Sequence, residues 1–139
     1  LGADFVVNAA QADTVEEIIK YTSGRGADLT IETAGTETTA TQAIHLSRKG
    51  AVVVLVGYGK SGMMNLPVSL AIDKELTFKT VFRYRHVYPV AIEAVAAGKV
   101  NLKGIVTNLF RFDDIQNAMD ASAHNKSEIV KSAVRIASV

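Results

Sequence analysis

Four short segments along the first part of the chain read as strands, at 4–8, 27–33, 51–56 and 76–82. The run Ala51–Val56 is apolar at every position, which is typical of a strand that helices cover on both faces. Stretches of helical length separate the first three segments, and such alternation indicates a parallel sheet. The pattern therefore predicts an α/β fold, in which a partial parallel sheet is flanked by helices.

Helix signals occupy the intervening stretches. Thr14 and Glu17 have the spacing of a capping box, in which a Thr at N-cap and a Glu three residues on satisfy each other's backbone amides. This predicts a helix from Thr14 to the stop at Ser23-Gly24. A second helix is predicted from about Thr39 to Ser47, and a helical turn at 66–70.

The character of the chain changes after Tyr84. Pro89 suits the first turn of a helix that ends before Gly98. An extended segment is predicted at 100–110, a second capping box at Asp113–Gln116 and a last strand at 133–136.

Two helices and two short extended segments cannot bury a good core alone. We therefore divide the chain into residues 1–84, which carry most of the parallel sheet, and residues 85–139, an α+β segment. The second region is expected to pack on the first and on structure outside this sequence.

Composition narrows the function classes. The chain has 139 residues, a net charge of +1 and 48% hydrophobic residues, so no strong field favours nucleic acid or a membrane surface. No apolar run approaches the ~20 residues that span a bilayer. The chain contains no cysteine, and its three histidines are far apart, so we expect no disulfide and no metal site within it.

A cytoplasmic protein is the expectation. The first residue is Leu, without a charged segment and apolar stretch after it, which suggests an excised piece without a signal peptide.

One glycine motif has two interpretations. Gly57, Gly59 and Gly62 match G-x-G-x-x-G directly after a strand, which is the spelling of a dinucleotide-binding turn if a helix begins at once. Pro67 would fall in the first turns of that helix and disrupt it. The alternative is a flexible loop that lies near a ligand without holding its phosphates. Glu32, at a strand end, has no nearby partner that would favour a role as general acid.

Several segments spread over the whole chain resemble segments of the medium-chain, zinc-type dehydrogenase family, and they follow one another in the same order as in that family. They are Leu1-Gly2-Ala3-Asp4, Gly24-Arg25-Gly26-Ala27-Asp28, Ile31-Glu32-Thr33-Ala34-Gly35, Gly50–Gly57 and Phe82-Arg83-Tyr84. The last, with Tyr88-Pro89-Val90-Ala91-Ile92, is most similar to the sorbitol, xylitol and iditol dehydrogenase branch.

The resemblance implies a Rossmann-like cofactor domain without its first βαβ unit, a C-terminal segment that returns to the catalytic domain, and NAD or NADP as cofactor. The implied cofactor contacts are Thr33, Ala34, Val56, Gly57, Tyr58, Phe82, Arg83 and Lys131, and the implied substrate contacts are Arg83 and Tyr84. Small residues let the backbone approach a ligand closely, although tight turns would equally explain Thr33, Ala34 and Gly57.

The family's zinc ligands precede the Leu-Gly-Ala-Asp segment, so the resemblance implies zinc only in a longer protein. We expect this chain alone to bind the cofactor weakly or not at all, to contain no catalytic residue and to be inactive. A polyol or alcohol substrate and a homo-oligomer formed through the cofactor domain are also implied. The alternatives are a zinc-free, quinone-reductase-like relative and a non-catalytic assembly module in which the strand at 76–82 pairs with a second copy.

Overall fold

The computed structural model describes residues 2–59, 62–125 and 127–137. These residues form two compact units, which are described separately. The first runs from Asp4 to Arg83, and the second is formed chiefly by the chain from Tyr84 onward.

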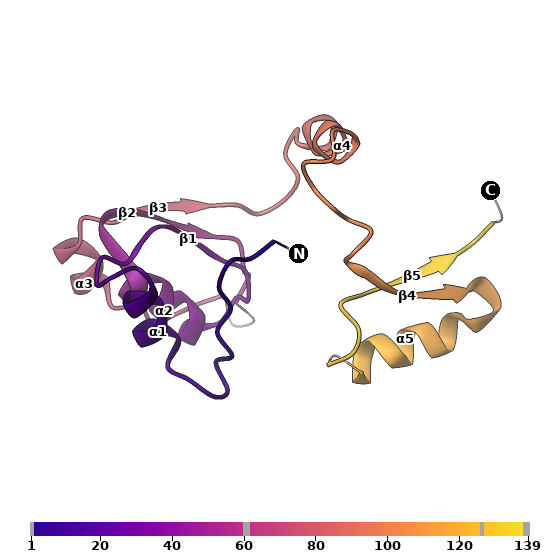
Figure 1. Ribbon diagram of the computed structural model, residues 1–139, viewed down its shortest axis with the longest axis horizontal. Coiled ribbons are helices and arrows are strands. Elements are labelled where there is room, and N and C mark those ends of the chain that lie inside the picture. Colours follow the sequence, from indigo (N-terminus) through magenta and orange to yellow (C-terminus); the bar gives the residue numbers. More distant parts are fainter. Residues whose placement is uncertain (1, 60–61, 126, 138–139) are drawn as a thin grey trace. The chain divides into compact units, whose positions relative to one another are not determined.

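The first unit contains a three-stranded parallel sheet in the order β1-β2-β3 (Figure 1). Its elements are α1 (Thr14–Tyr21), β1 (Ala27–Glu32), α2 (Glu37–Leu46), β2 (Ser47–Leu55), α3 (Val68–Asp73) and β3 (Thr77–Thr80). The predicted α/β class and parallel sheet are confirmed.

The core of the first unit lies between the sheet and α2. Ile44 of α2 and Val53 of β2 are fully buried, and Thr30 of β1 is 8% exposed on the same face of the sheet. On the opposite face of β1, Leu29 and Ile31 are 54% and 60% exposed. Among the described residues of this unit, helices therefore cover one face of β1.

The N-cap of helix α1 lies one residue before the predicted cap, Thr14. The Asp13 side chain accepts hydrogen bonds from the amides of Val15 at 2.8 Å and Glu16 at 3.0 Å, so Asp13 is the N-cap. The Thr14 hydroxyl is buried without a hydrogen-bond partner. The prediction of Thr14 as cap is wrong, because Asp13 already satisfies these amides.

The predicted strand at 4–8 is also wrong, since this segment is irregular. The Phe5 ring stacks on the Tyr21 ring with centroids 4.5 Å apart and planes 7° apart. Phe5 thus packs against the end of α1 and the segment takes no place in the sheet.

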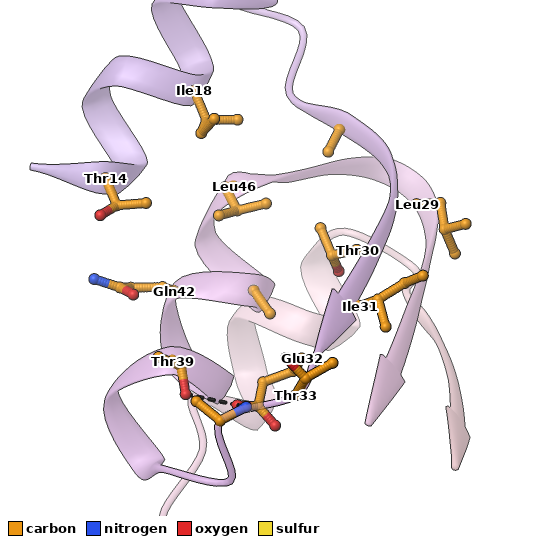
Figure 2. Close-up of a pocket in the computed structure, with 13 residues that line it drawn as sticks. Thr14, Ile18, Leu29, Thr30, Ile31, Glu32, Thr33, Thr39, Gln42 and Leu46 are labelled. Atoms are coloured by element: carbon orange, nitrogen blue, oxygen red, sulfur yellow. Dashed lines mark hydrogen bonds between the residues drawn. The ribbon is translucent and has the colours of Figure 1, made fainter. Parts of the chain in front are cut away.

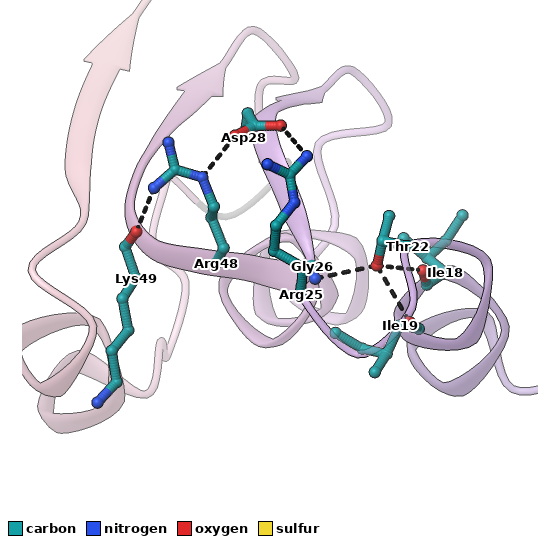
Figure 3. A network of polar contacts seen from close by, with 8 residues as sticks. All are labelled: Ile18, Ile19, Thr22, Arg25, Gly26, Asp28, Arg48 and Lys49. Atoms are coloured by element: carbon teal, nitrogen blue, oxygen red, sulfur yellow. Dashed lines mark hydrogen bonds and ion pairs between the residues drawn. The ribbon is translucent and has the colours of Figure 1, made fainter.

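A polar network fixes the beginning of β1 (Figure 3). Asp28 accepts a hydrogen bond from Arg48 Nε at 2.5 Å and another from Arg25 at 2.8 Å. The Arg48 hydrogen bond chiefly lowers the pKa of Asp28. At the preceding turn, the Gly26 amide donates to the Thr22 hydroxyl at 2.9 Å. These contacts lie at the amino end of the strand and align β1 with β2.

Lys74 joins the end of α3 to the end of α2. Its ammonium group donates to the carbonyl oxygens of Ile44 at 3.1 Å, His45 at 2.6 Å and Ser47 at 2.8 Å. Helix C-termini leave carbonyl groups without partners, and a lysine there satisfies them and complements the helix dipole. Burial lowers the pKa of Lys74.

The second unit pairs two parallel strands and packs a helix beside them. Its elements are α4 (Tyr88–Ala96), β4 (Val106–Arg111), a 3₁₀ turn (Phe112–Asp114), α5 (Ile115–His124) and β5 (Lys131–Arg135). Pro89 lies in the first turn of α4, as predicted. The capping box predicted at 113–116 is wrong: Asp114 is the N-cap of α5, and no side chain caps the helix.

Candidate functional site

The carboxyl ends of β1 and β2 are joined by hydrogen bonds at one residue. The carbonyl oxygen of Glu32 accepts from the amides of Val56 at 2.8 Å and Gly57 at 3.1 Å. Ligands of open α/β sheets bind at this edge, beyond the carboxyl ends of parallel strands. The loops that follow β1 and β2 therefore form the candidate site.

These two loops touch through their backbones. A β-carbon added to Gly57 would overlap the backbone of Gly35, and one added to Gly35 would lie 2.7 Å from the Tyr58 amide nitrogen. Gly35 also has a φ of +70°, which favours glycine. Both glycines are thus required for the loops to approach each other, which is the packing explanation weighed for Gly57.

The Glu32 side chain organises the first loop and points toward Thr39 of α2 (Figure 2). It is 4% exposed, and its Oε1 accepts hydrogen bonds from the Ala34 amide at 2.9 Å, the Gly35 amide at 2.8 Å and the Thr39 hydroxyl at 2.7 Å. Its Oε2 is buried without a hydrogen-bond partner. Glu32 is therefore a positioning carboxylate under the loop.

Burial alone would raise the pKa of Glu32, but the hydrogen bonds prevail. Bonds from Thr39 and from the amides of Gly35, Ala34 and Thr36 lower the pKa below its ordinary value of 4.5. The carboxylate is ionised near neutral pH. An ionised carboxylate has no proton to donate, so Glu32 is a poor general acid.

A pocket of about 440 Å³ lies between the two loops. The first loop contributes Ala34 to Glu37 and the second contributes Tyr58, Gly59, Met63 and Met64. Glu37 accepts hydrogen bonds from the amide of Asn65 at 3.0 Å and from its side chain at 3.2 Å, which ties the second loop to the start of α2. The pocket has the size of a small-molecule site.

A second pocket of about 420 Å³ lies between α1, α2 and β1 (Figure 2). Ile18, Leu46 and Ala43 line it, with Thr14 and Gln42 at its margin. It borders β1, which is an edge strand of the described sheet. Its lining also includes Glu32, Thr33 and Ala34 at the carboxyl end of β1, so it reaches the candidate site.

The predicted contacts divide into two sets. Thr33, Ala34, Val56, Gly57 and Tyr58 follow β1 and β2 and lie together at the candidate site, and Phe82 and Arg83 follow β3. Tyr84 and Lys131 belong to the second unit, where Lys131 is exposed at the start of β5. Their roles toward a cofactor or substrate stay predictions.

The glycine motif does not open a helix. After Gly62 the chain is irregular until α3 begins at Val68, and Pro67 is the residue before it. Lys60 and Ser61, inside the motif, lie outside the described residues. The dinucleotide-turn interpretation requires a helix directly after Gly62 and is therefore wrong.

Sequence reasoning missed two functional side chains, Glu32 as a positioning group and Glu37 as a tie between loops. A signal for the first was present, since an acidic residue at a buried strand end precedes Gly35 and Thr39 at turn spacing. No local pattern links Glu37 to Asn65, because the contact spans 28 positions.

Neither a metal-ligand cluster nor a membrane-spanning helix is present in the described part of the chain. It contains no group of three or more His, Cys, Asp or Glu side chains placed to hold a metal ion. No described helix is long and apolar enough to cross a bilayer.

Comparisons with known proteins agree with this architecture. The sequence profile of the family described as zinc-binding dehydrogenase matches residues 1–97. The zinc-type alcohol dehydrogenase-like protein YdjJ of Escherichia coli (strain K12) is 38% identical over 98% of this chain and 39% of its own length. Sorbitol dehydrogenase of Bacillus subtilis (strain 168) is 33% identical over 94% of this chain and 37% of its own length.

A crystal structure of an Escherichia coli oxidoreductase/dehydrogenase of unknown specificity superposes with a TM-score of 0.89 at 36% identity, over 99% of this chain and 39% of that one. The fold, with a candidate site at the ends of its parallel strands, is an α/β fold of the kind found in alcohol dehydrogenases. The chain belongs to the zinc-binding dehydrogenase family. It spans only about 37–39% of the length of these relatives.

Proposed function

We propose that this chain is the C-terminal part of the nicotinamide-cofactor region of a zinc-dependent polyol or alcohol dehydrogenase. The observation that carries the proposal is the joined pair of loops at the ends of β1 and β2, in a chain of this family. The sorbitol dehydrogenase relative supports a polyol substrate.

NAD or NADP is the proposed cofactor, and when bound it accepts a hydride from the substrate. The chain's own residues bind and orient it: Thr33 and Ala34 lie in the loop whose Ala34 and Gly35 amides Glu32 holds, and Val56, Gly57 and Tyr58 lie beside them. Phe82 and Arg83 extend this surface beyond β3. Lys131 is proposed as a contact to the cofactor's phosphates.

Arg83 and Tyr84 are the proposed substrate contacts. A guanidinium presents several donors in a fixed plane, which suits the hydroxyl groups of a polyol. Residues 85–139 are proposed to belong partly to the catalytic domain.

The residues present do not fit zinc, because the chain has no cysteine and the described residues lack a ligand cluster. We propose that the metal ligands lie outside these 139 residues. The chain by itself is then inactive and binds NADH weakly. A zinc-free, quinone-reductase-like relative is the alternative enzyme.

Assembly through the sheet edge is a second proposed role. β3 is the last strand in the sheet order, and Thr77, Phe78, Lys79 and Thr80 are all exposed. An unpaired edge can hydrogen-bond to the same edge of a second copy. Light scattering after size-exclusion chromatography tests this: a dimer supports it and a strict monomer contradicts it.

The protein is proposed to be cytoplasmic.

The coding sequence upstream of the Leu1 codon tests the main proposal. We expect an open frame that encodes a G-x-G-x-x-G turn and, further upstream, Cys, His and Glu metal ligands. A start codon directly before Leu1 would contradict the proposal and favour the assembly role.

A further inference from the structure

Tyr58, Phe82 and Arg83 form a continuous aromatic and cationic surface at the ends of β2 and β3. The Tyr58 and Phe82 ring centroids are 6.1 Å apart, with ring planes tilted by 50°. The Arg83 Cζ atom lies 5.0 Å from the Phe82 centroid. Phe82 thus contacts both of the other side chains, which follow different strands.

Both rings are exposed although the backbone beneath them is anchored. Tyr58 is 77% exposed and Phe82 is 73% exposed. The Tyr58 backbone lies against Gly35, and the Val81 amide donates to the Leu55 carbonyl at 3.0 Å, just before Phe82. Large apolar side chains held in water on a fixed backbone mark a binding surface.

We propose that Tyr58 is a positioning and specificity-determining residue for polyol substrates. Its ring supports Phe82, and the Phe82 ring in turn holds the Arg83 guanidinium toward the substrate hydroxyl groups. This inference rests on the proposed dehydrogenase function.

The geometry gives Tyr58 this role through packing. A tilted pair of rings is a favourable aromatic arrangement, and a guanidinium near a ring face gains a cation–π contact. Without the Tyr58 ring, Phe82 loses its tilted aromatic contact, and the orientation of Arg83 is less restricted. Only a substrate with further hydroxyl groups senses that orientation, because a simple secondary alcohol offers Arg83 nothing to bind.

The test compares Tyr58→Leu with Tyr58→Phe in the protein that the complete reading frame encodes. The measurements are kcat and KM for xylitol and for 2-butanol, and the dissociation constant of NADH. Tyr58→Leu is expected to raise the ratio of the xylitol KM to the 2-butanol KM about tenfold, because any loss of the proposed Tyr58 contact to the cofactor affects both substrates alike. Tyr58→Phe, which keeps the ring, is expected to restore this ratio.

Tyr21→Leu is the matched control, since Tyr21 is an exposed tyrosine stacked on a phenylalanine away from the site. An unchanged ratio of the xylitol KM to the 2-butanol KM in Tyr58→Leu, or an equal change of that ratio in Tyr58→Phe, would overturn the proposal.

A second measurement separates this inference from the proposed function. The Arg83 Nε–H signal in NMR spectra reports the nearby Phe82 ring, and we expect Tyr58→Leu to shift it while Tyr58→Phe leaves it close to wild type. If the wild-type protein oxidises no polyol, the proposed function fails. This signal then still decides whether Tyr58 positions Arg83, and an unshifted signal in Tyr58→Leu contradicts that role.

Discussion

Gly57 lies directly against Glu32, and the two residues join the loops of the candidate site. The Gly57 amide donates to the Glu32 carbonyl at 3.1 Å, and a β-carbon on Gly57 would lie 2.6 Å from Glu32 Oε2. The Glu32 side chain therefore organises the first loop and also leaves no room for a side chain at Gly57 in the second loop.

Gly57→Ala should destabilise the fold by about 1–3 kcal/mol, because the new methyl group meets backbone that cannot move aside. Gly59→Ala is the matched control. A β-carbon there meets the Met64 methyl group at 2.8 Å, and the end of that flexible side chain can move. Denaturant unfolding measures both, and equal stability of the two variants would refute this steric account.

Glu32→Gln should cost roughly 1–3 kcal/mol at neutral pH, because a buried acceptor of three hydrogen bonds loses its charge. The pKa of Glu32 is lowered in the fold, so its stabilisation is complete above about 4.5 and is lost as the pH falls through the lower folded pKa. The wild type should therefore lose stability over this acidic window, relative to Glu32→Gln.

Unfolding free energies measured against pH test this prediction, with Glu93→Gln, at an exposed position, as the control. A parallel pH dependence in Glu32→Gln and wild type would show that Glu32 does not carry the effect.

Lys74→Met should lower the free energy of unfolding by about 1–3 kcal/mol, because three carbonyl groups near the end of α2 lose their donor. Lys49→Met, at an exposed position, is the control and should change it by less than about 0.5 kcal/mol. Hydrogen exchange should also quicken at the end of α2. Unchanged exchange in Lys74→Met would contradict the proposed cap.

Asp13→Ala should destabilise α1 by about 0.5–2 kcal/mol, as expected for loss of an N-cap. Thr14→Val keeps the side-chain shape and removes a buried hydroxyl without a partner, so it should be neutral or slightly stabilising. Thermal unfolding of both variants tests the assignment. A larger loss in Thr14→Val would restore Thr14 as the cap.

The sequence predicted the parallel sheet because the apolar run at 51–56 and its neighbours carry strong local signals. It misplaced the first cap because Asp13 and Thr14 are both good cap residues, and only the backbone geometry distinguishes them. Residues 4–8 have strand-like composition, but a strand needs a neighbour, and Phe5 packs on Tyr21 instead.

At the candidate site, the sequence placed Thr33, Ala34 and Gly57 at strand ends, where they are found. It did not reveal the contact of Gly57 with Gly35 or the bonds of Lys74 to α2, since both join segments distant in the sequence. Such contacts depend on how the elements pack, and local patterns do not encode them.

The most direct test of the central claim is polyol oxidation by the protein that the complete reading frame encodes. Its rate with NAD+ or NADP+ should be measured before and after removal of zinc by a chelator, beside the 139-residue chain alone. We predict turnover that disappears with the zinc and returns when zinc is restored, with none from the chain alone. Absence of nicotinamide-linked polyol turnover, or turnover that chelation leaves unchanged, would contradict the account.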